Sequence, residues 1–594
     1  MSVLETPRIY FKGQVTWDPI TSNNYNFNYD EDTGETIYPS VIDKVKKFRA
    51  QAITQVGTQG NWNPHGTHRV TFFDSAVCGF DVGAGTNTND HFMNAAVNLQ
   101  GMLVDLEPFG GISSQIFFDT MCFGVEGGYG IFASRTSRMH DRYINFARNS
   151  ANSMIAGVAS VVWQASFSKA DGLSINAFDS FALQRLSDAL KRDDVLGLTV
   201  RFNAYRTIYF DNPELTNKSP ATQAAAKELI KKLNEGGFQP NPARSLLVGV
   251  IGLWREGEPP HEPGDRALIQ DANSPLGSAW VRVDSASLVI DLSNSVPEVD
   301  KNLAKQDLGT LSIVAVEPTS QAVTNLGSLP YSQYDRSAYE ATAGIVTVSI
   351  SADAVQALTG QDIQIRNSQG DQLLAELPLR GIPATPNLYL DEGDQVTARF
   401  QVYQRGVPVS ARIALQLYQT DAAGDPPSKV MQVTTDQNGG LTVPITAGAG
   451  SITAYVPSFN ALDQPTNGIN PQVNTYMYVR VRPADTSLAQ LPPTWENVYV
   501  KVLANWNAMA PCMDNWLRLD DPVQVKAYAA ILKRLTDPAN FESFLFMPVT
   551  RDMSVGQRTL LYNFLDAPAV KSLLEAETES IPSFAELSRS MRRF

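Results

Sequence analysis

The chain has 594 residues, of which 43% are hydrophobic and 18% charged, and its net charge is −14 with a pI near 5.0. Its length predicts about three or four domains with enough apolar material for large cores. The acidic balance and the absence of dense Lys/Arg runs exclude nucleic acid as an expected partner, because phosphate binding needs clustered basic residues.

The sequence carries no targeting or membrane signal that we recognise. The amino terminus contains Glu5 and lacks the apolar core of a secretory signal peptide. The most apolar run, Met154 to Trp163, is about half as long as a transmembrane helix. Three scattered cysteines predict neither a disulfide framework nor a zinc ribbon. We therefore expect a cytoplasmic protein without a transmembrane segment, although export without a signal peptide would leave the same features.

Residues 1–275 are predicted to form a β-rich amino-terminal domain. Short apolar stretches alternate with Gly, Asn, Asp and Thr, a pattern typical of strands of about four to eight residues between turns. The stretches with this pattern are RIYFKGQVTW, HRVTFFD, LVDLEPFG, SQIFFDT, GVASVVWQASF, VLGLTVRFNAYRTIYF and ARSLLVGVIGLWREGE.

Two helices are predicted inside this domain. The first lies in AFDSFALQRLSDALKRDD, where Asp179 or Ser180 can cap its start. Its apolar residues recur at helical spacing, at Phe178, Ala182, Leu186 and Leu190. The second lies in PATQAAAKELIKKLNEGGF and ends at Gly236 and Gly237.

The rest of the chain predicts three further units. Residues 276–385 show strand-like alternation and form a second β unit. Residues 386–485 carry short strands with turns at regular spacing, including Asn438-Gly439, which is typical of an Ig-like sandwich. Residues 490–594 have helix starts and apolar stripes. The expected fold is therefore mainly β and multi-domain, with sandwich or barrel-like sheets and a helical carboxy-terminal segment.

The stretch GNWNPHGTHRVTFFDS contains His65 and His68, two of the five histidines. Asn63-Pro64 disfavours a helix there, and in an extended chain residues three apart point to opposite faces. A loop could still join them, with Asp74, His91 or Cys78 as remote ligands. We predict no metal site, and we expect His68 to stand where a strand begins.

Three acidic residues follow on adjoining predicted strands, at Asp105, Glu107 and Asp119. Asp105 and Glu107 share a strand face by period two, so the pair could perform general acid/base chemistry. Acids in such a turn-rich stretch more often cap turns or pair with arginine. We therefore keep Asp105 and Glu107, together with His68, as weak catalytic candidates.

Two further stretches favour structural over functional readings. The glycine-rich run Gly124–Phe132 lacks the Lys and Ser/Thr of a phosphate-binding loop and predicts a turn or bulge. A polar cluster follows it, where a small anion could bind, although a solvated loop is the favoured interpretation. Its members are Arg135, Arg138, His140, Asp141 and Arg142.

Three blocks, taken in order, resemble a known family. They are MSVLETPRIYFKGQ; FDSFALQRLSDALKRDDVLGLTVRF with VGVIGLWREGE; and WENVYVKVLANWNAM with FMPVTRDMSVGQRTLLYNFL. They are similar to the amino-terminal part of the family of the violacein-pathway synthase VioB and chromopyrrolate synthase. The resemblance implies a long β-rich part ahead of a ferritin-like domain, coupling of two oxidised tryptophan-derived imines, and an association with iron or haem.

The chain departs from that family after the third block. It ends at Phe594 and has no histidine after His261, so we expect no ferritin-like bundle with paired Glu-x-x-His motifs. The resemblance therefore implies a separately encoded ferritin-like partner or self-assembly. Within the matched blocks only the region of His68 looks shared.

Three hypotheses of function follow. The first is a non-catalytic β-rich scaffold or binding protein that acts with a partner or as an assembly. The second is a haem- or iron-associated enzyme or subunit of secondary metabolism, with His68, His91 or His140 as weak candidates for binding the cofactor. The third is a toxin or interaction component exported without a signal peptide. The first is favoured.

Overall fold

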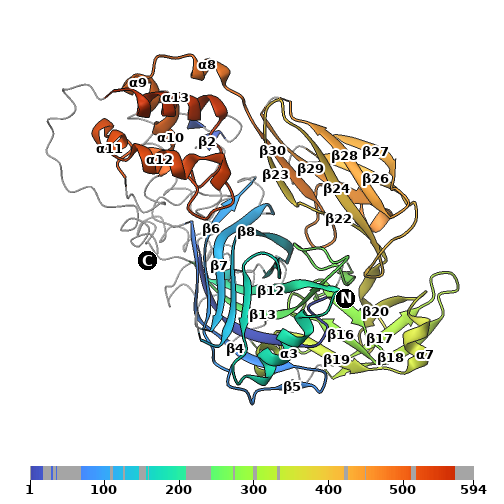
Figure 1. Ribbon diagram of the computed structural model, residues 1–594. Coiled ribbons are helices and arrows are strands. Elements are labelled where there is room, and N and C mark those ends of the chain that lie inside the picture. The colour runs from blue at the N-terminus through green and yellow to red at the C-terminus, as the bar shows by residue number, and fades with distance from the viewer. Residues whose placement is uncertain are drawn as a thin grey trace, which may run out of the picture.

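The computed structural model (Figure 1) contains three large β modules and a helical carboxy-terminal part. It describes residues 2–17, 29–30, 35–36, 68–106, 112–124, 128–145, 156–157, 160–208, 243–271, 274–298, 304–330, 335–420, 426–448, 450–509 and 517–568. The prediction of a mainly β fold with helices near the carboxy terminus is confirmed. His65, Glu107 and the helix predicted around residues 220–238 lie outside the described residues.

The first module is an 11-stranded antiparallel sheet that closes on itself, and we call it the barrel. Its path runs through β1 (Arg8–Trp17), β13 (Ala243–Arg255), β12 (Val195–Ile208), β10 (Ser160–Ser168), β8 (Gly130–Asn145), β7 (Ser114–Gly124), β6 (Val97–Asp105) and β4 (Arg69–Asp81). Because β4 also pairs with β1, the ring is complete. The short strands β5 (Thr86–Asn87), β9 (Ala156–Gly157) and β11 (Leu173–Asn176) pair at its margins. Each stretch predicted as a strand in residues 1–275 supplies one of these strands.

Apolar side chains fill the interior of the barrel, because alternate residues of each strand face inward. Trp17 and Trp163 pack with ring centroids 5.8 Å apart, and Phe72 and Phe202 with centroids 5.1 Å apart. At Gly249 a Cβ atom would lie 2.2 Å from the ring of Phe11, so a larger residue there would require that ring to shift. The interior is a packed core.

Helix α3 (Phe181–Leu190) covers one end of the barrel, as the sequence predicts. Ser180 is its N-cap and accepts a hydrogen bond from the backbone N–H of Leu183 at 3.1 Å. Phe178 differs from the prediction. It precedes the helix with φ +38° and is 77% exposed, because the chain turns there into the cap that Asp90 also holds.

The second module is an eight-stranded sheet with its own apolar core. Its order is β18 (Val323–Pro330), β17 (Thr310–Val316), β20 (Asp362–Arg366), β21 (Gln372–Leu377), β14 (Arg266–Gln270), β15 (Ala279–Val283), β16 (Ser287–Asp291) and β19 (Ile345–Ser349). Helices α6 (Arg336–Ala341) and α7 (Ala352–Ala357) connect its strands. The strand β14 joins this sheet although it precedes residue 276.

The third module is a sandwich of two sheets around one core. One sheet contains β22 (Leu379–Pro383), β24 (Gln395–Gln404), β25 (Val407–Pro408) and β28 (Gly440–Thr446). The other has the order β23 (Asn387–Asp391), β30 (Met477–Arg482), β29 (Ser451–Ser458), β26 (Ala414–Thr420) and β27 (Lys429–Thr434), with β23 parallel to β30. This strand order is compatible with an Ig-like sandwich, a description that stays a prediction.

The helical segment follows the sandwich and packs around its own core. Its helices are α8 (Thr486–Ala489), α9 (Trp495–Val498), α10 (Ala504–Met509), α11 (Pro522–Ala527), α12 (Ala529–Thr536) and α13 (Val555–Asp566), with a π-helical turn, η3 (Tyr499–Leu503), between α9 and α10. Ser554 and Gln557 form a capping box at the start of α13. The part of the predicted helical segment that follows residue 568 lies outside the described residues.

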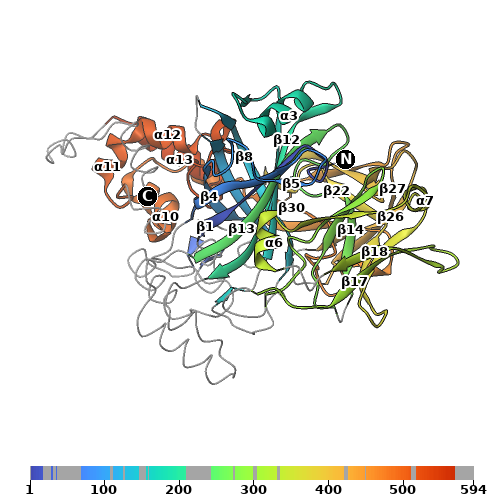
Figure 2. The ribbon, with the colours of Figure 1, turned by 90° about the horizontal axis from the view of Figure 1, so that it is seen from below.

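The modules contact one another through the outer face of the barrel. Tyr10 and Val250 of the barrel pack with Val289 and Tyr339 of the second module, and α6 lies against the strands β1 and β13 (Figure 2). On another side, Phe117 of β7 packs with Phe544 and other residues that precede α13. None of the helices in the described part of the chain is long and apolar enough to cross a membrane.

Candidate functional site

His68 stands directly before β4, as predicted, and is 3% exposed. Its Nδ1–H donates to the carbonyl of Leu103 at 3.0 Å. Burial, and secondarily the charge of Arg551, lowers the pKa of His68 to about 4, so the imidazole is neutral at neutral pH. The geometry gives this side chain a role in joining β4 to β6. Its candidacy as a catalytic or cofactor-binding residue stays a prediction.

The predicted carboxylates hold structure together. Asp105 is buried at the end of β6 and accepts a hydrogen bond from the hydroxyl of Ser114. Asp119 accepts from the hydroxyl of Ser543 and the N–H of Phe544, each at 3.2 Å, and so fastens the chain ahead of α13 to β7. Asp105 and Asp119 therefore bond to different partners. Glu107 lies outside the described residues, so its predicted pairing with Asp105 on one strand face stays a prediction.

The histidine candidates occupy different surroundings. His91 is at the surface, with its Nε2 3.7 Å from a carboxylate oxygen of Asp179. His140 is 1% exposed on β8, and β6 and β7 lie between β8 and the strand β4 that follows His68. Two strands of the barrel, β6 and β7, therefore lie between His68 and His140.

His140 belongs to a buried polar junction between the barrel, the linker ahead of β14, and the sandwich. Its ring packs edge to face on His261, with centroids 5.1 Å apart. Burial is the main cause that lowers the pKa of both histidines, that of His261 to about 3, so both are neutral at neutral pH. The further members of this polar junction are Asp141, Arg142, Tyr143, Glu262, Arg380 and Tyr476.

The centre of the polar junction is a carboxylate shared by two guanidinium groups. Oε2 of Glu262 lies 3.9 Å from Arg142 and 3.9 Å from Arg380, and it accepts a hydrogen bond from the hydroxyl of Tyr143 at 3.1 Å. Burial raises the pKa of the neighbouring Asp141 to about 7, although Arg142 opposes the shift. Such a buried network needs all of its charged partners to remain favourable.

The arrangement around His140 does not fit iron or haem. No group of three or more His, Cys, Asp or Glu side chains with metal-binding geometry occurs among the described residues. The edge-to-face contact of His140 with His261 leaves no gap between the rings for a macrocycle.

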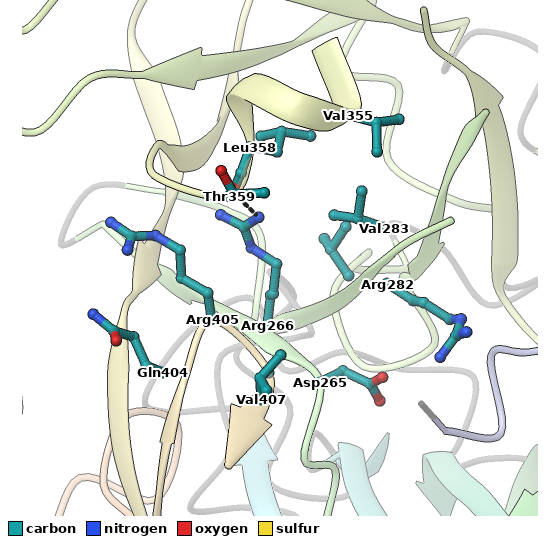
Figure 3. Close-up of a pocket in the computed structure, with 12 residues that line it drawn as sticks. Asp265, Arg266, Arg282, Val283, Val355, Leu358, Thr359, Gln404, Arg405 and Val407 are labelled. Carbon is teal, nitrogen blue, oxygen red and sulfur yellow. Dashed lines mark hydrogen bonds between the residues drawn. The ribbon is translucent and has the colours of Figure 1, made fainter. Parts of the chain in front are cut away.

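A cleft of about 630 Å³ lies between the second module and the sandwich (Figure 3). Branched aliphatic side chains form part of its wall, and three arginines bring cationic groups to it. Its lining residues are Asp265, Arg266, Val281, Arg282, Val283, Val355, Leu358, Thr359, Gln404, Arg405, Gly406 and Val407. Clefts of this size between modules are typical of ligand-binding sites.

Sequence reasoning missed both the cleft and most of the polar junction. Arg405 sits in a tight turn before Gly406, which has φ +78°, and Arg266 begins a strand of another sheet. His261 and Glu262 lie in the proline-rich stretch between β13 and β14. No local pattern marks these residues, because their neighbours come from distant parts of the chain.

Comparison with known proteins supports the predicted family resemblance. No family model matches the chain. It is 26% identical over 443 residues to the 2-imino-3-(indol-3-yl)propanoate dimerase of Chromobacterium violaceum. That match takes in 70% of this chain and 38% of the dimerase, so the chain spans well under half of that relative's length.

Solved structures add two remote likenesses. The D0–D1 domain of intimin is 15% identical, with 34% of this chain and 92% of that chain covered and a TM-score of 0.13. The trypsin-activated alpha-2-macroglobulin of Escherichia coli is 9% identical, with 80% and 40% covered and a TM-score of 0.13. Scores this low carry no argument about the fold. The sequence match stands, and most of this chain is similar to part of a 2-imino-3-(indol-3-yl)propanoate dimerase.

Proposed function

We propose that this chain is a non-catalytic β-rich scaffold or binding protein of secondary metabolism that acts with a separate partner or as an assembly. The observation that carries the proposal is the set of buried polar contacts that tie the barrel, the sandwich and the helical segment into one body. Such contacts fix the orientation of modules, which is what a scaffold needs.

The tie between the barrel and the helical segment centres on Arg551. This side chain is 0% exposed, and its guanidinium carbon lies 3.4 Å from the ring centroid of Phe117 on β7. It donates to the carbonyls of Val549 at 2.8 Å and Ser543 at 2.9 Å. Arg138 of β8 adds an ion pair with Glu542 at 3.3 Å.

The tie between the barrel and the sandwich uses polar groups of β7, β8 and β30. Gln115 donates to the hydroxyl of Tyr389 at 2.8 Å, and Arg480 donates to the carbonyl of Leu106 at 3.2 Å. Arg142 also stacks over the ring of Tyr476 with its guanidinium carbon 4.5 Å from the centroid. These side chains are committed to protein partners, which supports a structural rather than a catalytic use.

The similarity to the dimerase supports the placement in secondary metabolism. That protein's name describes the joining of two indole-bearing imines. For this chain we propose association with a separately encoded ferritin-like protein, or with further copies of itself, in the cytoplasm. A fractionation of the producing cells tests the location, since recovery in washed medium without lysis markers would contradict it.

A mixing experiment tests the scaffold role. The purified chain would be run on size exclusion with light scattering, alone and with the ferritin-like protein from the same organism. We expect either a defined assembly of this chain or a stoichiometric complex. A monomer that stays separate from the partner across micromolar concentrations would contradict the proposal. An Arg135→Gln variant is the control and should assemble as the parent chain does, because the surface ion pair of Arg135 with Asp171 joins no modules.

A further inference from the structure

We propose that the cleft between the second module and the sandwich binds a small amphipathic organic anion, with the anionic group on Arg405 and the apolar body on the aliphatic wall. This binding activity goes beyond the scaffold role. Its evidence is the volume of the cleft, the chemistry of its two sides, and the hydrogen bonds already made by each arginine.

One side of the cleft is apolar. Val281, Val283, Val355 and Leu358 come from β15 and from α7 and the residue after it, and Figure 3 shows Val283 and Val355 facing the same space. Val407 closes the opposite rim and is 63% exposed. Covering this surface with the apolar body of a ligand would remove it from water, which is the main favourable term in binding such molecules.

Arg405 is the cationic group with capacity left for a ligand. Its Nε and Nη2 both bond to one oxygen of Asp362, at 3.1 and 2.7 Å. Its Nη1 donates no hydrogen bond to any of the described residues. A guanidinium binds carboxylate, sulfonate or phosphate oxygens through such N–H donors.

Arg266 differs from Arg405, although Figure 3 places the two guanidinium groups on the same side. Its Nε and Nη2 bond to Glu376 at 2.8 and 2.5 Å, and its Nη1 donates to the carbonyl of Leu358 at 2.9 Å. Its Nη2 also donates to the carbonyl of Gln361 at 2.6 Å. Arg266 therefore holds α7 to the sheet and has no donor nitrogen left over.

The charges that face the cleft favour an anion. Arg266, Arg282 and Arg405 line it. The acids that pair with them are not among the lining residues; these acids are Glu376, Asp284, Glu5 and Asp362. The carboxylate that does line it, Asp265, is paired with Arg201 at 3.1 Å. Figure 3 shows the guanidinium of Arg282 directed away from those of Arg266 and Arg405, so Arg405 is the group that we assign to an incoming anion.

Two fluorescent probes of similar shape test this inference on the full chain. The anion 8-anilinonaphthalene-1-sulfonate and the uncharged N-phenyl-1-naphthylamine would each be titrated into the protein. We expect saturable binding of the sulfonate at one site, weakening with added salt, and a salt-independent affinity for the uncharged probe. In Arg405→Gln, sulfonate affinity should fall about tenfold, while the uncharged probe should lose about twofold or less.

Two further variants keep the test decisive. Val355→Trp fills the apolar side, so it should abolish the binding of both probes even if Arg405→Gln loosens the cleft. Arg366→Gln is the control, because this arginine of the same module bonds to Gln364 outside the cleft. Thermal melting of each variant confirms that it is folded. Unchanged sulfonate affinity in folded Arg405→Gln and Val355→Trp would overturn the inference.

Discussion

The barrel's contact with the helical segment and the cleft both place arginines between modules, but with opposite results. At the first, Arg551 lies flat on Phe117 and bonds to backbone carbonyls, so the surface is sealed. At the second, Arg405 pairs with Asp362 and still faces a space of about 630 Å³. The difference indicates that a guanidinium joins modules rigidly when aromatic rings and carbonyls enclose it. Where aliphatic side chains line a cleft beside the guanidinium group, the group can still bind a ligand.

The largest effect is expected in the polar junction, where one carboxylate is the shared counter-charge of two buried guanidinium groups. Glu262→Gln would leave the buried guanidinium groups of Arg142 and Arg380 without their shared counter-charge. We expect the free energy of unfolding to fall by about 4 kcal/mol in urea denaturation. Glu542→Gln, which removes a half-exposed partner of Arg138, is the control and should cost less than about 1 kcal/mol. Equal losses in the two variants would show that burial does not set the cost of removing a counter-charge.

The next effect concerns the sealed contact itself. Arg551→Ala removes the cation–π contact with Phe117 and leaves the carbonyls of Ser543 and Val549 without this donor. We expect a loss of about 3 kcal/mol of unfolding free energy. Limited proteolysis should also release the chain around α13 from the barrel at lower urea. A variant as stable as the parent would show that Arg551 does not hold this contact.

An acid-dependent effect of intermediate size should come from His68. Its folded pKa, about 4, lies below the ordinary value of 6.5, so between these pH values the unfolded chain binds the proton and the folded chain does not. The stability contributed by neutral His68 is therefore full above pH 6.5 and is lost as the pH falls toward 4, by about 3 kcal/mol. His68→Asn should flatten this slope in urea titrations at successive pH values. Parallel slopes for the two proteins would contradict the assignment.

The smallest effect is expected at the surface of the barrel. Arg135 pairs with Asp171 at 3.4 Å, and both side chains are about half exposed. Arg135→Gln should change the unfolding free energy by less than about 0.5 kcal/mol, because solvent and salt screen exposed pairs. A loss above 1 kcal/mol, measured in the same urea series, would mean that exposed arginines contribute as much to stability as the buried arginines between modules.

Local pattern predicted seven strands of the barrel, since alternation of apolar residues is a property of each strand alone. It missed β8, because the polar cluster from Arg135 to Arg142 favoured a solvated loop. That interpretation is wrong: the cluster lies within the strand, and His140, Asp141 and Arg142 are buried between modules. RIYFKGQVTW is the whole of β1, and His68 stands just before β4 as expected. The closing contact of β1 with β4 could not be predicted, because it depends on pairing across sequence-distant strands. His261 and Arg405 were missed for the same reason. Phe178 was placed in a helix on spacing alone, and the cap at Ser180 excludes it.

The central claim, a non-catalytic scaffold, is tested most directly by an absorption spectrum of the native protein taken together with its metal content. We expect no absorption beyond that of its aromatic residues and less than a stoichiometric amount of any transition metal. A haem Soret band or iron at one equivalent per chain, retained through size exclusion, would contradict the account.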